Sequence, residues 1–181
     1  MSRIVTALAS VLLTILAAGL VPGAANAAEL VVGRATTIIS DSMSNPNPRL
    51  FTDTVMDYRI SVSNPVGNLT SSVKTVVIVE NIPTNCDLQM TDLPGANNRG
   101  PVEFIDNNLL GVNLIRSGLA YTYDPASVDS IEFSTDGTNW VSSASATSGN
   151  YNPSIRAIRI TLAGTFATST TVQLRYRVKI R

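Results

Sequence analysis

Apolar and polar residues alternate along several stretches of this chain, which is the pattern of strands with one buried face. In residues 55–62, Met, Tyr, Ile and Val alternate with Asp, Arg and Ser. In residues 172–180, Val, Leu, Tyr, Val and Ile alternate with Gln, two Arg and Lys. A period of two places all apolar side chains of a strand on the same face. The pattern therefore predicts two half-buried strands whose register is well fixed.

Shorter apolar runs between turn residues indicate further strands. We expect them at 29–39, 73–82, 86–90, 102–105, 119–123, 131–133 and 158–162. The run 73–82 is almost continuously apolar, so we expect this strand to be buried on both faces. The Asp136-Gly137 pair predicts a hairpin, because glycine supplies the positive φ angles of tight turns. The sequence also allows one turn of helix within 109–119.

About nine or ten strands with frequent turns predict an all-β fold, specifically an immunoglobulin-like β-sandwich. We expect three parts: a cleavable signal peptide at 1–27, an extended strand and Pro-rich linker at 28–50, and the sandwich domain at 51–181. The linker contains Pro46 and Pro48, which exclude regular structure there.

The first 27 residues have the layout of a secretory signal peptide. A positive start with Arg3 is followed by an apolar run at 4–21, a Pro-Gly break and the cleavage site Ala25-Asn26-Ala27. Cleavage there predicts a protein of the periplasm, the cell surface or the extracellular space, with no transmembrane segment after maturation. The alternative is an uncleaved anchor, because eighteen apolar residues reach the lower limit of a membrane-spanning helix.

The composition argues against an enzyme and against nucleic acid as a partner. Histidine is absent, which removes the usual nucleophile triads and zinc sites, and the acidic and basic residues balance at 13 each. The single cysteine, Cys86, allows no internal disulfide, and we interpret it as a small buried side chain rather than a reactive thiol. No cofactor is expected. Calcium stays an alternative for Asp- and Asn-rich loops such as 41–47, although such residues are also ordinary in turns.

Two groups of residues are candidates for interaction. The first is a cationic stripe that is either a solvated sheet face or a patch for acidic polymers, comprising Arg159, Arg175, Arg177 and Lys179. The second is the extended N-terminal segment with its apolar residues Val31, Val32, Ile38 and Ile39. Asn68-Leu69-Thr70 matches a glycosylation sequon, a pattern that also arises often by chance.

Several segments resemble a conserved-repeat surface domain of bacteria and archaea, known as domain-of-unknown-function family eleven. They are residues 58–65, 76–79, 82–83, 131–137 with Trp140, 157–160 and 172–178. The resemblance implies an immunoglobulin-like sandwich in secreted or surface proteins and brings no catalytic residues. Members often occur as tandem repeats, whereas this chain carries a single copy.

These patterns predict a secreted, non-enzymatic structural or interaction protein of the envelope or extracellular space. One version is a self-assembling fibre subunit, in which the segment around 29–39 pairs with the next subunit. In the alternative for the same segment, it is the first strand of its own sandwich. The alternative function is a monomeric module that binds glycans or surface polymers. Expected partners are therefore the protein itself, other envelope proteins or glycans.

Overall fold

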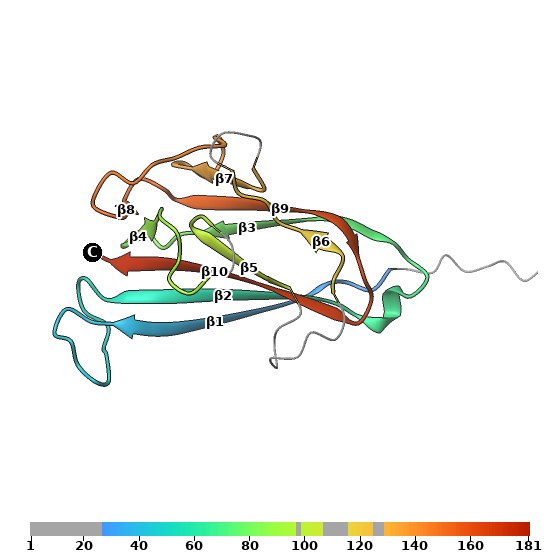
Figure 1. The fold of residues 1–181 in the computed structure, drawn as a ribbon, viewed down its shortest axis with the longest axis horizontal. Coiled ribbons are helices and arrows are strands. Elements are labelled where there is room, and N and C mark those ends of the chain that lie inside the picture. The colour runs from blue at the N-terminus through green and yellow to red at the C-terminus, as the bar shows by residue number, and fades with distance from the viewer. Residues whose placement is uncertain (1–26, 97–98, 107–115, 125–128) are drawn as a thin grey trace, which may run out of the picture.

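The computed structural model describes residues 27–96, 99–106, 116–124 and 129–181 (Figure 1). The predicted signal peptide lies outside the described residues except for Ala27, and so does most of the segment 109–119. The described part is all-β, with about 49% strand and two antiparallel sheets in a sandwich-like arrangement. Its only helical element is the short 3-10 turn η1 (Val66–Asn68).

The larger sheet, sheet A, is built around the last strand of the chain. Its hydrogen-bonded order is β1 (Val31–Ser40), β2 (Val55–Asn64), β10 (Thr170–Ile180), β4 (Cys86–Gln89) and β8 (Tyr151–Asn152), with β5 (Val102–Asp106) also paired to β10. The smaller sheet, sheet B, has the order β3 (Val73–Asn81), β9 (Ala157–Phe166) and β6 (Leu119–Ala120), with β7 (Ile131–Ser134) also paired to β9. The strands of sheet A therefore come from both ends of the described chain.

The core lies between the sheets and follows the predicted alternation. On β10 the apolar positions from Val172 to Val178 are buried, and their register with β2 runs unbroken from Thr170 to Lys179. On β9, Ile158, Ile160 and Leu162 are fully buried. The rings of Tyr58 and Tyr176 stack across β2 and β10 with centroids 5.2 Å apart. The period-two prediction is thus confirmed for these strands.

The prediction that residues 73–82 are buried on both faces is wrong. Strand β3 lies at the edge of sheet B, and only its inward positions pack against the core. Val77 and Val79 point to the other face and are 54% and 50% exposed. β-branched residues favour a strand even when its second face is exposed to solvent. Their continuous run therefore did not indicate burial on both faces.

The hairpin predicted around Asp136-Gly137 is present, with a longer loop than a two-residue turn. Phe133 and Val141 exchange both backbone hydrogen bonds, at 2.8 and 2.9 Å. Gly137 has a φ of 80°, and the Ser134 hydroxyl accepts a hydrogen bond from its N–H at 2.8 Å. The Asp136 carboxylate accepts hydrogen bonds from two backbone N–H groups of the loop and from a side-chain amide, and this lowers its pKa.

Candidate interaction surface at the first strand

Strand β1 lies along the margin of the molecule, with β2 on one side only (Figure 1). Within the described residues its outer edge has no strand partner, and eight of its ten residues are exposed. The four apolar candidates of the N-terminal segment all lie on it: Val31, Val32 and Ile39 are exposed, and Ile38 is half-buried against the core. The structure therefore has the arrangement in which this segment is the first strand of its own sheet.

Strand β1 extends past the edge of sheet B. Its register pairs Val32 with Val62 and Arg34 with Ile60, so these residues share the core-facing side of sheet A. Val62 and Ile60 are 2% exposed, whereas Val32 is 52% exposed and the Arg34 side chain is 62% exposed. The inner face of β1 from Val32 to Thr36 is thus left mostly uncovered, because sheet B ends at β3 in the described part of the chain.

One ion pair connects the two sheets at this margin. The Arg34 guanidinium donates two hydrogen bonds to the Glu80 carboxylate on β3, at 3.3 and 3.0 Å. This contact raises the pKa of Arg34 above its usual value. Glu80 is almost buried, while Arg34 lies on the open side. The pair therefore links the inner face of β1 to β3.

The start of β1 is held by a buried asparagine. Asn68 is 1% exposed, accepts a hydrogen bond from the Ala28 N–H at 2.7 Å and donates to the Ala28 carbonyl at 2.8 Å. Its amide also donates to the Asn64 side chain, whose own amide donates to the Phe166 carbonyl. The sequon asparagine is therefore engaged inside the protein and is not a free glycan acceptor in the folded state.

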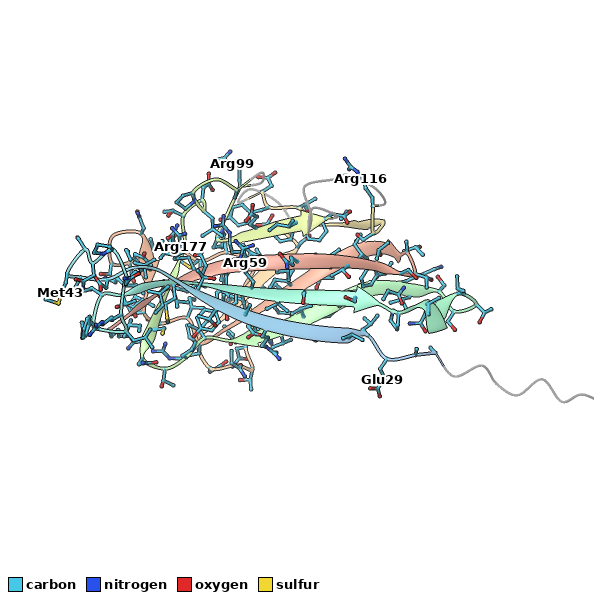
Figure 2. The ribbon with its side chains drawn as sticks, turned by 90° about the horizontal axis from the view of Figure 1, so that it is seen from below. Glu29, Met43, Arg59, Arg99, Arg116 and Arg177 are labelled. Carbon is cyan, nitrogen blue, oxygen red and sulfur yellow. The ribbon has the colours of Figure 1, made fainter. Side chains whose placement is uncertain are left out.

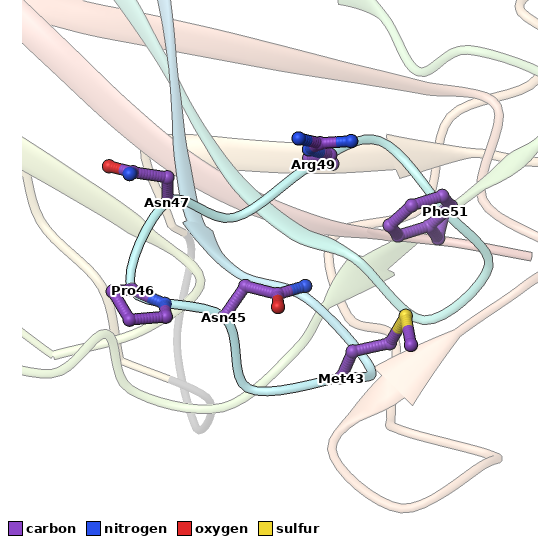
Figure 3. Close-up of a pocket in the computed structure, with 6 residues that line it drawn as sticks. All are labelled: Met43, Asn45, Pro46, Asn47, Arg49 and Phe51. Atoms are coloured by element: carbon purple, nitrogen blue, oxygen red, sulfur yellow. The ribbon is translucent and has the colours of Figure 1, made fainter.

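The end of β1 leads into a loop that is organised by one carboxylate. Asp41 is 6% exposed and accepts hydrogen bonds from the N–H groups of Met43, Asn45 and Arg49 and from the Asn45 side chain, at 2.8 to 3.1 Å. The loop lines an open pocket of about 460 Å³ (Figure 3). Both Asp41 oxygens thus face hydrogen-bond donors, which is the environment of a structural turn rather than of a cation site.

The Asp41 contacts make a prediction about pH. Hydrogen bonds from Asn45 lower the pKa of Asp41 from its ordinary 3.8 to about 2. A lowered carboxyl pKa stabilises the folded loop at neutral pH, and this contribution is lost as the pH falls from about 4 to about 2. We expect NMR titration to place the Asp41 carboxyl near pH 2. We also expect Asp41→Ala to speed amide exchange of Met43, Asn45 and Arg49 about tenfold at pH 7, whereas Asp53→Asn leaves it unchanged.

A second pocket, of about 430 Å³, lies beneath the last residues of β1. It is lined mainly by apolar atoms and is bounded by Thr36, Ile38, Leu50, Met56, Tyr58, Pro83, Asn85, Cys86 and Ile180. Cys86 is 2% exposed, as expected for a small buried side chain, and burial raises the pKa of its thiol. The pocket opens where the inner face of β1 loses its cover.

The cations of β10 do not form an open face. Arg175 is 9% exposed and donates to Glu103 at 2.6 Å, to Asp57 at 3.1 Å and to the Pro94 carbonyl at 3.0 Å. Arg177 donates two hydrogen bonds to Asp57, at 2.6 and 3.0 Å. The sequence predicted that Arg175 and Arg177 belong to a solvated or ligand-binding face, and this prediction is wrong for both. The loop around Pro94 covers Arg175, and the carboxylates of Glu103 and Asp57 neutralise the two arginines.

The other two cationic candidates also have partners. Arg159 pairs with Glu132 at 2.7 Å and lies 4.6 Å from the ring centroid of Trp140. It belongs to sheet B, so it does not join Arg175 and Arg177 on one surface. Lys179 pairs with Asp53 at 3.3 Å and lies over the Tyr151 ring. The apolar candidates therefore all lie on β1, whereas Arg159 on β9 is separated from the three cationic candidates on β10.

Sequence reasoning missed three residues that position this surface, namely Arg34, Glu80 and Asn68. Glu80 interrupts the apolar run of β3 at an inward position, and this single acid in a predicted strand was the available signal for a buried carboxylate with a cationic partner. Asn68 was noted in the sequence only as part of a glycosylation sequon, and nothing around it indicated its contact with Ala28. Figure 2 shows that Glu29, next to the residue held by Asn68, lies far from Met43 at the other end of β1.

Comparisons with family models, with curated proteins and with solved structures find no match to this chain. Among the described residues, no helix has the length and apolar character needed to cross a membrane. The same residues contain no cluster of three or more His, Cys, Asp or Glu side chains arranged to hold a metal ion.

Proposed function

We propose that this protein is a secreted, non-enzymatic structural protein of the envelope or extracellular space that associates through the edge of β1. The observation that carries the proposal is a ten-residue edge strand, exposed on both faces, with six β-branched residues and one charge. Unpaired N–H and C=O groups along such an edge are a template for another strand. The predicted signal peptide supports the proposed compartment.

The edge lacks most of the features that discourage strand pairing. Edge strands are commonly short, carry Lys or Pro, or bulge away from their neighbours. β1 contains no Lys and no Pro, and its only irregularity lies between Ile38 and Ser40, at its very end. The eight residues from Val31 to Ile38 therefore present a regular edge.

We further propose that the fold is immunoglobulin-like and related to the conserved-repeat surface domain. Support comes from two antiparallel sheets between which the chain crosses repeatedly, as from β2 to β3 and from β9 to β10. The monomeric glycan-binding alternative has less support, because its cationic face relied on Arg175 and Arg177, which are ion-paired and covered. A fibre forms if strand pairing between copies does not close, and a discrete oligomer forms if it does.

The test is the state of association of the chain beginning at Ala28. Light scattering and negative-stain electron microscopy over a range of concentrations should show dimers, larger assemblies or filaments. Replacing Val31 and Val32 together with Lys should shift the chain to monomers, because lysine on an edge opposes strand pairing. Since both side chains are more than half exposed, the free energy of unfolding should change by less than about 1 kcal/mol.

The matched control is the double variant Leu69→Lys with Val141→Lys. Leu69 is 73% exposed and Val141 is 54% exposed, and neither residue belongs to β1. This variant therefore adds the same two charges and should associate like the unmodified chain. A protein that remains monomeric at all concentrations contradicts the proposal. So does association that persists unchanged in the double lysine variant.

A further inference from the structure

The margin formed by β1 and β3 has the shape of a step. Sheet A protrudes by one strand, and the inner face of that strand, carried by Val32, Arg34 and Thr36, is open to solvent. Directly beside this overhang, the outer edge of β3 has no strand partner among the described residues. The recess, defined here as the space bounded by the inner face of β1 and the outer edge of β3, has the position of one missing strand of sheet B.

An occupant of the recess has to meet three requirements. It must offer a free strand edge to β3, its inward side chains must pack against the inner face of β1, and it must lie beside β3 at the height where β1 does, which the contact between Arg34 and Glu80 places toward the end of β3. A protruding strand with a free edge and ten residues is present on the same molecule, namely β1 itself. The protruding β1 of one copy therefore matches the recess of a second copy that is rotated by half a turn about an axis parallel to the strands.

We infer that two copies join reciprocally, with β1 of each copy lying beside β3 of the other around a two-fold axis parallel to the strands. This inference rests on the proposed association through β1. The rotation exchanges the two layers, so sheet A of one copy continues as sheet B of the other. Because β1 and β3 run in the same direction (Figure 1), the new pairs are parallel, which is a permitted although slightly weaker ladder.

The side chains at this joint suit such a pairing. On the outer face, Val31 of one copy comes to the same sheet surface as Val77 and Val79 of the other, three exposed apolar side chains that the isolated chain leaves uncovered. On the inner face, the two Arg34 side chains approach the axis, each already neutralised by its Glu80. The joint therefore adds no uncompensated charge.

The symmetry makes a specific prediction about adjacent residues. In the reciprocal pair the inner faces of the two β1 strands look at each other across the axis, at the roughly 10 Å spacing of packed sheets. Thr36 of one copy then faces Thr36 of the other, whereas Thr37 points to the outer face, away from the axis. Both residues are exposed in the single chain, so each tolerates a small replacement.

The experiment is cross-linking with a short bis-maleimide on the chain beginning at Ala28. Thr36→Cys should yield covalent dimers at least tenfold more efficiently than Thr37→Cys, and the unmodified chain should report any background from the buried Cys86. Dimers in light scattering without this preference, or staggered filaments, overturn the reciprocal joint and leave the proposed function standing. A chain that stays monomeric at every concentration overturns both.

Discussion

Replacing Asp57 with Ala is expected to lower the free energy of unfolding by about 3–5 kcal/mol, because it leaves a buried charge without its partner. The Asp57 side chain is 2% exposed and receives three hydrogen bonds from Arg175 and Arg177. Without it, Arg175 retains Glu103, but Arg177 loses the carboxylate to which both of its hydrogen bonds go. Chemical denaturation at neutral pH measures the change directly.

A matched control separates this network from an ordinary ion pair. Asp53 pairs with Lys179 at 3.3 Å, but its side chain is 59% exposed. Solvent screens such a pair, so Asp53→Asn should change the free energy of unfolding by less than about 1 kcal/mol. Equal losses in Asp57→Ala and Asp53→Asn would falsify the assignment of a buried network.

Replacing Tyr176 with Ala is expected to cost about 3–5 kcal/mol, the range for removing a large ring from a packed core. Tyr176 is 1% exposed, projects from the central strand of sheet A and stacks on Tyr58 with an angle of 9° between the rings. Its loss leaves a cavity between the sheets and removes the stacking partner of Tyr58. Unfolding by urea, followed by fluorescence, gives the difference in free energy.

Replacing Tyr176 with Phe, in contrast, should not lower the free energy of unfolding. The Tyr176 hydroxyl is buried and has no hydrogen-bond partner among the described residues, and burial raises its pKa. Removing an unsatisfied buried hydroxyl relieves its desolvation cost. We therefore expect stability to be unchanged or to increase by about 1 kcal/mol, and a loss above 2 kcal/mol would show that the hydroxyl has a partner.

The sequence was sufficient to predict the strands that alternate and insufficient to predict which faces are covered. Alternation in β2 and β10 located the core positions, because a period of two in a half-buried strand follows directly from the pleat. The same logic assigned the polar face of β10 to solvent, where the structure instead has Arg175 and Asp57 beneath the loop around Pro94. A loop that folds over a distant sheet face leaves no periodic signal.

For the candidate surface at β1, too, the strand was predictable from the sequence and its surroundings were not. The apolar and β-branched composition of 29–39 identified a strand suited to pairing, and the structure has β1 there. Its overhang depends on sheet A extending past β3, which is a difference between two sheets and not a property of either strand's sequence. The clamp on Ala28 depends on Asn68, forty residues away.

The position of β10 at the centre of sheet A has a consequence for how this protein reaches its folded state. The hydrogen bonds between Asp57 and Arg177 close a loop of 120 residues, and β2, β4 and β5 all pair with this last strand. Such non-local pairing makes folding slow, typically milliseconds to seconds, because chain entropy is lost before contacts compensate. Sheet A therefore forms late in folding. During synthesis, β2, β4 and β5 have no β10 to pair with until the end of the described chain has been made.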